Sequence, residues 1–217
     1  MSKLPPNASV ASQTEDGKLC APSALRNAPV IVELLQQIAP PRGRALEIAS
    51  GTGQHISALA AAIPQIDWYP TEIAVDRITS IDAYAAQAAL DNLRPAQLLD
   101  ASVQGWAASH IPYDLIYLGN LLHLISAEAA ATVLLEAAST LAPQGHFVIY
   151  GPFKRDGILS SDGDAKFDAE LRAANSEIGY KDDQWIKQVL TGAGLDASLV
   201  QNMPANNLAL IAKRKPL

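Results

Sequence analysis

The sequence predicts an α/β fold in which a mostly parallel, seven-stranded sheet carries helices on both faces. Short apolar segments with strand character alternate with segments whose apolar residues recur at helical spacing. A glycine-rich turn follows the first strand of the sheet. The last two strands stand too close together in the sequence for a helical crossover, so we expect an antiparallel pair at one edge.

The amino-terminal half is expected to alternate between helix and strand. Apolar residues recur at helical spacing from Ser23, and Pro40 and Pro41 end this helix because proline cannot continue it. The elements expected up to residue 100 are a helix over 23–38, a strand over 44–49, a helix over 54–62, a strand over 65–69, a helix over 76–90 and a strand over 96–100.

The carboxy-terminal half continues the alternation and closes the sheet. The strand over 113–118 is bulky and apolar throughout, which is typical of a strand covered on both faces. Ser126 caps the next helix, which runs to Leu141, and Glu128 lies in its first turn, where the helix dipole favours an anion. The remaining elements are a strand over 146–150, a helix over 182–193, and strands over 197–201 and 207–212.

Length and composition indicate one domain. The chain has 217 residues, and 49% of them are hydrophobic, which is enough for a sizeable core. Residues 1–20 have no periodicity, so we expect a flexible tail, or a lid that orders with ligand, before a domain over 21–217. Cys20 is the single cysteine, which excludes an intrachain disulfide and indicates no cysteine metal site, so no metal is expected.

The charge balance and the lack of long apolar runs limit the partners. The formal net charge is -6, whereas proteins that bind duplex nucleic acid usually present a basic face. The first residues lack the apolar run of a signal peptide, and no stretch reaches the roughly 18 apolar residues that span a bilayer. We expect a cytoplasmic monomer or homodimer without nucleic-acid or membrane partners.

The strongest local signal is the segment 47–53, Glu-Ile-Ala-Ser-Gly-Thr-Gly, at the carboxyl end of the first strand, where open α/β sheets bind ligands. Gly51 and Gly53 let the backbone turn sharply and approach a ligand without an intervening Cβ. A dinucleotide-binding loop would need a third glycine where Ile56 stands. Glu47 and Ala49 instead fit a loop that binds S-adenosylmethionine, and the alternative is an ordinary tight turn.

Two more acids follow the next two strands. Glu72 lies just after the second strand and can accept hydrogen bonds from both ribose hydroxyls of a nucleoside. Asp100 ends the third strand and can bind the exocyclic amine of adenine, unless it is a helix cap or part of a solvated turn. Glu47 can accept from the cofactor's ammonium group, or it is a buried structural carboxylate. The three acids predict S-adenosylmethionine as cofactor and S-adenosylhomocysteine as product.

Asn120 and His123 follow the fourth strand, near the expected position of the transferred methyl group. We assign Asn120 to cofactor binding and His123 to catalysis, because an imidazole can take a proton from an O–H, N–H or S–H nucleophile. Alternatively, His123 packs against the helix and orients Asn120, and proximity alone drives the transfer.

Several polar side chains are expected near the substrate. Lys154 and Arg155 give an acidic protein a local positive charge, which favours an anionic group on the substrate, although Asp156 can instead pair with Arg155 on a solvated loop. Arg26, on the first helix, can pair with the carboxylate of cofactor or substrate, or it lies on the helix surface. The expected substrate-binding residues are Asn27, Tyr150, Phe153, Lys154, Arg155 and Asn206, of which Asn206 also suits a β-turn.

On these residues the chain resembles the DUF938 family of methyltransferase-like proteins, which includes the methyltransferase-like 26 group. The matching stretches are Arg26-Asn27, 46–55, 68–72, 120–123, 150–157 and 203–208, and the likeness runs from Ser23 to the carboxyl terminus. The resemblance implies a class I S-adenosylmethionine-binding fold with helices on both faces of a Rossmann-like sheet. Two departures are Glu72, where many relatives carry Asp, and Tyr-Leu-Gly before Asn120, where a Cys- or Ala-containing run is more usual.

The leading functional hypothesis is a methyltransferase that acts on an O, N or S nucleophile of a small molecule, for which the charge of Lys154 and Arg155 favours an anionic group. Methylation of nucleic-acid amines is disfavoured, because the segment 119–123 lacks the Asn/Asp-Pro-Pro-aromatic string of such enzymes. A second hypothesis is a non-catalytic module that binds S-adenosylmethionine for a regulatory or partner-binding role. A third and weaker one is an NAD-dependent enzyme.

Overall fold

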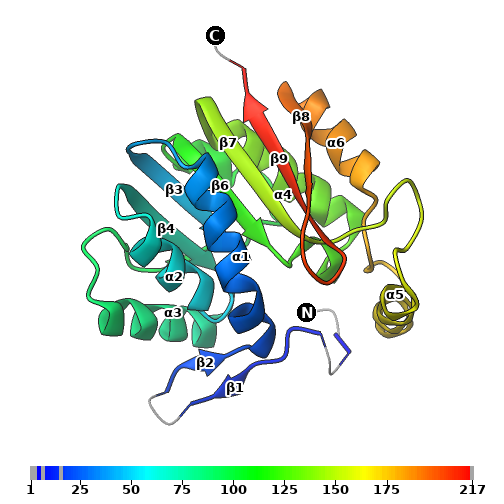
Figure 1. Ribbon diagram of the computed structural model, residues 1–217, viewed down its shortest axis with the longest axis horizontal. Coiled ribbons are helices and arrows are strands. Elements are labelled where there is room, and N and C mark those ends of the chain that lie inside the picture. The colour runs from blue at the N-terminus through cyan, green and yellow to red at the C-terminus, as the bar shows by residue number, and fades with distance from the viewer. Residues whose placement is uncertain (1–3, 6–7, 15–16, 216–217) are drawn as a thin grey trace.

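The computed structural model describes residues 4–5, 8–14 and 17–215, and its centre is a seven-stranded sheet (Figure 1). In spatial order, the strands are β5 (Gln97–Leu98), β4 (Ile66–Glu72), β3 (Gly43–Ile48), β6 (Tyr113–Gly119), β7 (Leu141–Pro152), β9 (Asn207–Arg214) and β8 (Leu195–Asn202). The strands from β5 to β7 pair in parallel, whereas β9 lies antiparallel between β7 and β8. This confirms the predicted sheet and its antiparallel edge pair.

Helices cover both faces of the sheet. On one face lie α1 (Pro22–Ile38), α2 (Gln54–Ala62) and α3 (Val75–Ala88), and on the other lie α4 (Ala127–Thr140) and α6 (Asp183–Gly192). Strand β6 shows why both faces must be covered: Leu115 packs with the first set of helices, and Ile116 with the second. Both residues are fully buried, so the strand is apolar throughout because it is covered on both faces, as predicted.

Side-chain caps define where several helices begin. The Ser126 hydroxyl accepts a hydrogen bond from the Ala129 N–H at 3.1 Å, which confirms the predicted cap of α4. Two short 3-10 helices, η1 (Trp106–Ser109) and η2 (Leu122–Leu124), connect the strands to this layer. Helix α5 (Asp162–Ala174) was not predicted, because its apolar stripe is narrow and a charged residue stands at almost every second position. The local signal for α5 was Ser161, which caps it by accepting from the Asp164 N–H at 3.2 Å.

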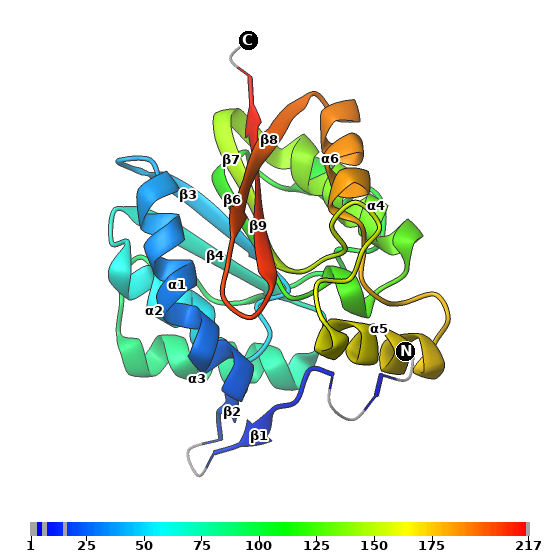
Figure 2. The same ribbon diagram turned by 45° about the vertical axis from the view of Figure 1, so that its right-hand side comes forward.

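Part of the segment expected to be a tail or lid is structured. Its strands β1 (Ser12–Gln13) and β2 (Leu19–Cys20) form an antiparallel hairpin, and we call residues 8–14 and 17–20 the strap. Figures 1 and 2 show the strap and α5 at the same end of the molecule, where the parallel strands finish. Residues 1–3, 6–7 and 15–16 of the expected tail lie outside the described residues, and the domain boundary at residue 21 remains a prediction.

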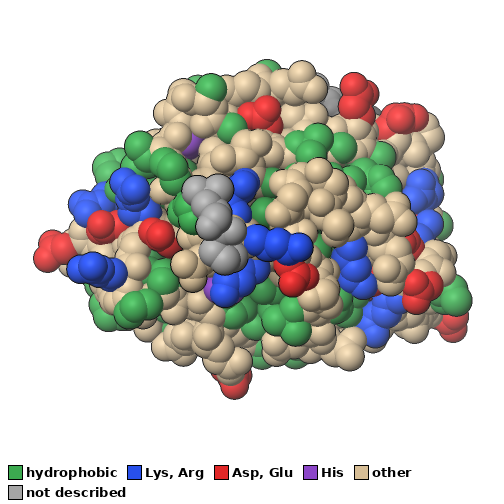
Figure 3. All heavy atoms as spheres, turned by 90° about the horizontal axis from the view of Figure 1, so that it is seen from above, with side chains coloured by type: hydrophobic (Ala, Val, Ile, Leu, Met, Phe, Trp, Pro, Cys, Tyr) green, Lys and Arg blue, Asp and Glu red, His purple; other side chains and the backbone are tan. Residues whose placement is uncertain are grey.

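The opposite end of the molecule carries the amino ends of the parallel strands. Figure 3 looks onto that end, where Lys and Arg side chains are interspersed with Asp and Glu rather than gathered into a field of one sign. Among the helices within the described residues, none has the length and apolar character that crossing a bilayer requires.

Candidate functional site

The glycine loop after β3 depends on backbone conformations that glycine favours. Gly51 has φ of 61° and Gly53 has φ of 94°. A Cβ on Gly53 would lie 2.8 Å from the Ile81 Cα of α3, so the absence of a side chain lets α2 approach α3 closely. A Cβ on Gly51 would have Arg77 Nη1, at 3.6 Å, as its only neighbour within 4 Å among the described residues. The two glycines therefore have separate roles, since Gly53 allows packing and Gly51 leaves space above the loop.

Ala49 enters the same loop with φ of 54°, an unusual value for a residue with a side chain. The next residue, Ser50, donates its N–H to the Thr71 carbonyl of β4 at 2.8 Å. Its hydroxyl accepts from the Thr71 N–H at 3.3 Å. The loop is thus held to the neighbouring strand by backbone and side chain together, and this support stabilises the unfavourable conformation of Ala49.

Glu72 is buried where β4 ends, and it joins that end to the glycine loop. One carboxylate oxygen accepts from the Gly51 N–H at 2.9 Å, and the other accepts from Ile73 N–H at 2.8 Å and Ala74 N–H at 3.3 Å. A carboxylate has roughly four lone-pair sites, so these three donors leave about one for a ligand. Accepting from two ribose hydroxyls therefore requires Glu72 to release one of its backbone partners.

Asp100 lies beyond β5, exposed and next to the end of β4. One of its oxygens accepts from the Ser102 N–H at 3.0 Å and from the Ser102 hydroxyl at 2.5 Å. Three large apolar side chains that are close to Glu72 or Asp100 in the sequence are exposed: Ile73 (45%), Leu98 (68%) and Val103 (58%). Ile73, which directly follows Glu72, was not among the residues predicted for the site.

Glu47 belongs to a group of buried polar atoms that no described residue satisfies. We call this group the buried polar cluster, and its members are Glu47 Oε2, His55 Nε2, the Tyr117 hydroxyl and the Tyr150 hydroxyl. A buried polar group without a partner costs about 1–3 kcal/mol, and such groups are rare in folded proteins. The predicted site contained Glu47 and Tyr150, whereas no local pattern indicated that His55 and Tyr117 would join them.

Burial changes the protonation of the cluster. Desolvation, with a smaller contribution from the Glu72 charge, raises the pKa of Glu47 from 4.5 to about 8, although a hydrogen bond from Ser50 opposes the shift. Desolvation lowers the pKa of His55 from 6.5 to about 4. Desolvation and the Glu47 charge hold the pKa of Tyr117 well above its usual range. At neutral pH the cluster is therefore largely uncharged.

Asn120 lies where the ends of β6 and β7 meet. Its backbone adopts the left-handed conformation, with φ of 57°, and its N–H donates to the Tyr150 carbonyl at 2.8 Å. A Cβ on Gly151 would lie 3.8 Å from the Asn120 Cα, so the two chain segments are in close contact. The structure therefore brings Asn120 beside Tyr150, which belongs to the buried polar cluster.

His123, in η2, is buried against α5. Its ring centroid lies 5.9 Å from that of Phe167 and 6.1 Å from that of Tyr180, both in angled geometries. Desolvation, assisted by the Lys181 charge, lowers the pKa of His123 from 6.5 to about 3. The imidazole is thus neutral at pH 7 but weakly basic, and its assignment as the catalytic base remains a prediction.

The loop after β7 is more ordered than a solvated loop. Phe153 is buried in the core, and Lys154 pairs through its backbone with the 181–183 segment. Arg155 donates to the Asn206 carbonyl at 3.3 Å, and the Asn206 side chain donates to Asp164 at 3.1 Å. The structure therefore joins two predicted substrate contacts, Arg155 and Asn206, and places Phe153 inside the protein.

The predicted residues on α1 lie at its surface, because Arg26 is exposed and Asn27 is half-buried. A different arginine lies beside the glycine loop: Arg77 of α3 donates to the Ser9 hydroxyl of the strap at 2.6 Å. No motif separated Arg77 from the other surface arginines in the sequence.

The strap crosses the end of the sheet from α5 to α3. At its outer end Ala8 packs with Leu171 and Tyr180. At its inner end the Leu19 N–H donates to the Ser80 hydroxyl at 2.8 Å, and the Ala21 N–H just beyond the strap donates to Gln54 at 2.7 Å. The strap therefore lies across the edge that carries the predicted site.

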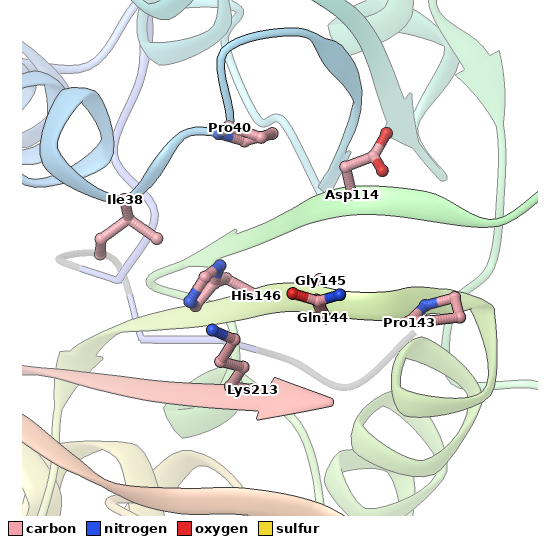
Figure 4. Close-up of a pocket in the computed structure, with 8 residues that line it drawn as sticks. All are labelled: Ile38, Pro40, Asp114, Pro143, Gln144, Gly145, His146 and Lys213. Carbon is pink, nitrogen blue, oxygen red and sulfur yellow. The ribbon is translucent and has the colours of Figure 1, made fainter. Parts of the chain in front are cut away.

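A hollow of about 260 Å³ lies at the other end of the sheet (Figure 4). His146 and Lys213, neighbours on β7 and β9, line it together with Asp114. The pKa of His146 is lowered by desolvation and by the Lys213 charge. Asp114 lies at the start of β6, and Lys213 lies near the end of the antiparallel strand β9, so the hollow is separate from the glycine loop. Within the described residues, no group of three or more His, Cys, Asp or Glu side chains is placed to hold a metal ion.

Solved structures of methyltransferases share this fold. An O-methyltransferase family protein from Burkholderia thailandensis matches with a TM-score of 0.75 and 17% identity, over 87% of this chain and 56% of that one. An O-methyltransferase family 2 protein from Planctomyces limnophilus, in complex with apigenin, gives 0.76 and 18%, over 88% and 58%. Human N-acetylserotonin methyltransferase, in complex with S-adenosylmethionine, gives 0.70 and 13%, over 87% and 52%. This chain spans little more than half the length of these proteins.

A sequence-family model covers almost the whole chain. It is described as "Protein of unknown function (DUF938)" and matches residues 18–214, from the inner end of the strap to the last residue of β9. The match confirms the resemblance found in the sequence, and the chain belongs to the DUF938 family.

Proposed function

We propose that this chain is an S-adenosylmethionine-dependent methyltransferase, which transfers a methyl group to an O, N or S nucleophile of a small molecule. One observation carries the proposal: the glycine loop and three acids lie at the finishing ends of the adjacent strands β3, β4 and β5. The acids are Glu47, Glu72 and Asp100. Solved methyltransferases with the same fold support it, and the human relative in fold was solved with S-adenosylmethionine.

The site fits an adenosyl sulfonium in several respects. The space beside Gly51 is free of a Cβ, and the exposed Ile73 offers an apolar surface for a base. Glu72 would hold the ribose and Asp100 the adenine amine, while Asn120 lies next to the cluster that includes Glu47. No phosphate-binding array is needed, because this cofactor carries no phosphate.

When bound, S-adenosylmethionine supplies an electrophilic methyl group, and the remaining catalytic requirement is placement of the nucleophile. An acceptor atom held about 3 Å from that carbon and in line with the breaking bond reacts without further assistance if it is already deprotonated. His123 would accept the proton of a protonated nucleophile, although its low pKa makes it a weak base. Arg155, next to Asn206, would attract an anionic group of the acceptor.

The burial of His123 favours one alternative. If the imidazole only packs between Phe167 and Tyr180, it supplies no base, and a module that binds S-adenosylmethionine without turnover becomes the alternative to methyl transfer by proximity alone. Titration calorimetry with S-adenosylmethionine and S-adenosylhomocysteine tests the cofactor assignment common to both functions. Mass spectrometry of a panel of phenols, amines, thiols and carboxylates incubated with protein and S-adenosylmethionine then separates them. Binding without any methylated product favours the module, and absence of binding contradicts both.

A further inference from the structure

The hollow shown in Figure 4 lies where helix α1 ends. The helix ends at Ile38, and Pro40 follows, so helical cover stops at this point of the sheet. His146 and Lys213 lie next to that end and line the recess of about 260 Å³. Ile38 and Pro40 are also in its lining, which gives the recess an apolar wall beside two basic side chains.

His146 and Lys213 act from the same face of the sheet. They are register partners on the antiparallel strands β7 and β9, so their side chains leave that face together. The next residues inward on this face, Val148 and Ile211, are buried in the core beneath α1. His146 is half-buried and Lys213 is exposed. Figure 4 shows the ammonium group of Lys213 turned toward the imidazole ring.

Neither basic side chain has a partner within the described part of the chain, where both lack hydrogen bonds and ion pairs. Desolvation, assisted by the Lys213 charge, lowers the pKa of His146. Like charges directly opposite each other destabilise a pair of strands. A negative group between the two side chains would remove that repulsion and accept hydrogen bonds from both.

A bulge in β7 forms another wall of the hollow. The register between β6 and β7 shifts here, so that residues 142–145 loop out of the ladder. Gln144 adopts the left-handed conformation, with φ of 64°. A Cβ on Gly145 would lie 3.1 Å from the Asp114 carbonyl oxygen, so the bulge is held tightly against β6. The wall is therefore fixed by backbone packing rather than by mobile side chains.

Asp114 limits the charge that a ligand can carry. Its carboxylate accepts from the Arg44 N–H at 2.9 Å, and in Figure 4 it is turned away from His146. Its negative charge still borders the hollow and opposes a ligand with a second anionic group. The titratable and charged side chains of the lining are thus Asp114 from β6, His146 from β7 and Lys213 from β9.

We propose that the hollow is a second ligand site, which binds a small monocarboxylate through Lys213 and His146. The carboxylate accepts charge-assisted hydrogen bonds from both side chains, and the apolar part of the ligand lies against Ile38 and Pro40. The volume is below the roughly 300–1,000 Å³ of pockets for drug-sized ligands, which restricts the ligand to a few carbon atoms. The site is independent of methyl transfer, because it lies at the opposite end of the sheet from the glycine loop.

Butyrate is the probe, and the imidazole of His146 is the reporter. The chain has four histidines, so isotope-labelled histidine gives a simple NMR spectrum in which His146→Gln assigns the signal. Sodium butyrate replaces sodium chloride at constant ionic strength. We expect a saturable shift of the His146 signal and a rise in its pKa, because the bound anion offsets the Lys213 charge. His123, at the other end of β6, should not respond.

Three further probes test the chemistry of the site. Butyramide has the shape of butyrate without its charge and should leave the His146 signal unchanged. Succinate adds a second carboxylate and should bind more weakly than butyrate, because Asp114 repels it. Inorganic phosphate tests for a general anion site and should also bind more weakly. Tighter binding of succinate or phosphate than of butyrate would overturn the assignment to a monocarboxylate.

Two lysine variants separate the hollow from the overall charge of the protein. Lys213→Met should weaken butyrate about tenfold, because it removes a charged donor and keeps an unbranched side chain. The matched control is Lys215→Met, which removes an exposed lysine just beyond β9 that does not line the hollow, and its affinity should stay within about twofold. The proposal is overturned by the absence of a saturable His146 shift in wild type, by unchanged affinity in Lys213→Met, or by an equal loss in both variants.

Discussion

The carboxylate of Glu72 accepts a hydrogen bond from the backbone N–H of Gly51 at 2.9 Å, although the two residues lie on different strand ends. The same side chain accepts from Ile73 at 2.8 Å. One buried acid thus holds both the glycine loop and the turn that follows β4, and the shape of the loop depends on a neighbouring strand as well as on its glycines.

Replacing Glu72 with alanine should destabilise the protein by about 2–3 kcal/mol, because it leaves three part-buried backbone donors without their partner. Glu72→Gln keeps one acceptor oxygen without the charge, so about half of the loss is expected. Urea unfolding followed by circular dichroism measures both values. A Glu72→Ala protein as stable as wild type would show that solvent replaces these bonds at no cost.

Gly51→Val and Gly53→Val should fail in different ways. A Cβ at position 51 has only Arg77 within 4 Å among the described residues, so valine there costs about 1–2 kcal/mol of backbone strain, and the protein folds but loses S-adenosylhomocysteine binding. Valine at 53 collides with the Ile81 backbone and should cost more than about 3 kcal/mol. Thermal melts of the two variants measure the loss of packing, and titration calorimetry measures the loss of ligand binding. Normal affinity in Gly51→Val contradicts the loop assignment.

Stability should fall as pH rises from about 6.5 to about 8. The pKa of Glu47 is raised in the folded protein, from 4.5 to about 8, so the folded state binds more protons across this interval. The contribution of protonated Glu47 to the free energy of unfolding is complete below pH 4.5 and is lost as the pH approaches 8. Between pH 6.5 and 8 this single group accounts for a loss of about 2 kcal/mol.

The pH interval from 6.5 to 8 is chosen because the other buried groups with shifted pKa values affect stability outside it. The pKa values of His55 and His123 are lowered from 6.5 to about 4 and about 3, so they raise stability with pH only below 6.5. The pKa of Lys181 is lowered from 10.5 to about 8, so its effect begins only above that pH. Glu47→Gln should therefore flatten the curve between 6.5 and 8, as measured by urea unfolding at fixed ionic strength. An unchanged slope in that variant would assign the effect elsewhere.

His123→Phe tests whether the imidazole acts as a base. Phenylalanine preserves the aromatic packing with Phe167 and Tyr180, so folding and S-adenosylhomocysteine affinity should change little. We expect turnover of a protonated acceptor to fall by about 100-fold, the lower bound for loss of a general base. Because the pKa of His123 is about 3, the wild-type rate should not titrate through this residue above pH 5. Full activity in His123→Phe would assign the residue to packing.

Tyr117→Phe should stabilise the ligand-free protein by about 1 kcal/mol, because it removes a buried hydroxyl that lacks a partner. For a chain of this size, the melting temperature should rise by about 2–4 °C. Tyr113→Phe, measured in parallel, should show no such gain. Destabilisation in Tyr117→Phe would mean that solvent or a neighbouring group satisfies the hydroxyl.

Much of the fold could be predicted because periodicity and turn chemistry are local properties. The continuous apolar strand at 113–118 and the cap at Ser126 were recognised from their own residues, and both lie where they were expected. Helix α5 was missed because Phe167 and Leu171 give it only a narrow apolar stripe among charged residues. The hairpin of the strap was missed because each of its strands is two residues long.

Only those features of the candidate site that depend on the order of residues along the chain could be predicted from the sequence. Gly51, Glu72 and Asp100 were identifiable because each follows a strand, and parallel strands bring their ends together. The approach of His55 to Tyr117, and of Arg77 to the glycine loop, depends on how helices pack on the sheet. No local pattern encodes such contacts, and the burial that shifts the pKa of His123 likewise comes from α5.

The inner end of the strap also carries the single thiol of the chain. Cys20 is half-buried, and its sulfur lies 3.6 Å from the Gln54 side chain at the start of α2. An environment-sensitive fluorophore attached to Cys20 would report from the edge of the sheet where the glycine loop lies, with no substitution needed for labelling. Strap movement can therefore be followed in real time in a protein whose sequence is otherwise unaltered.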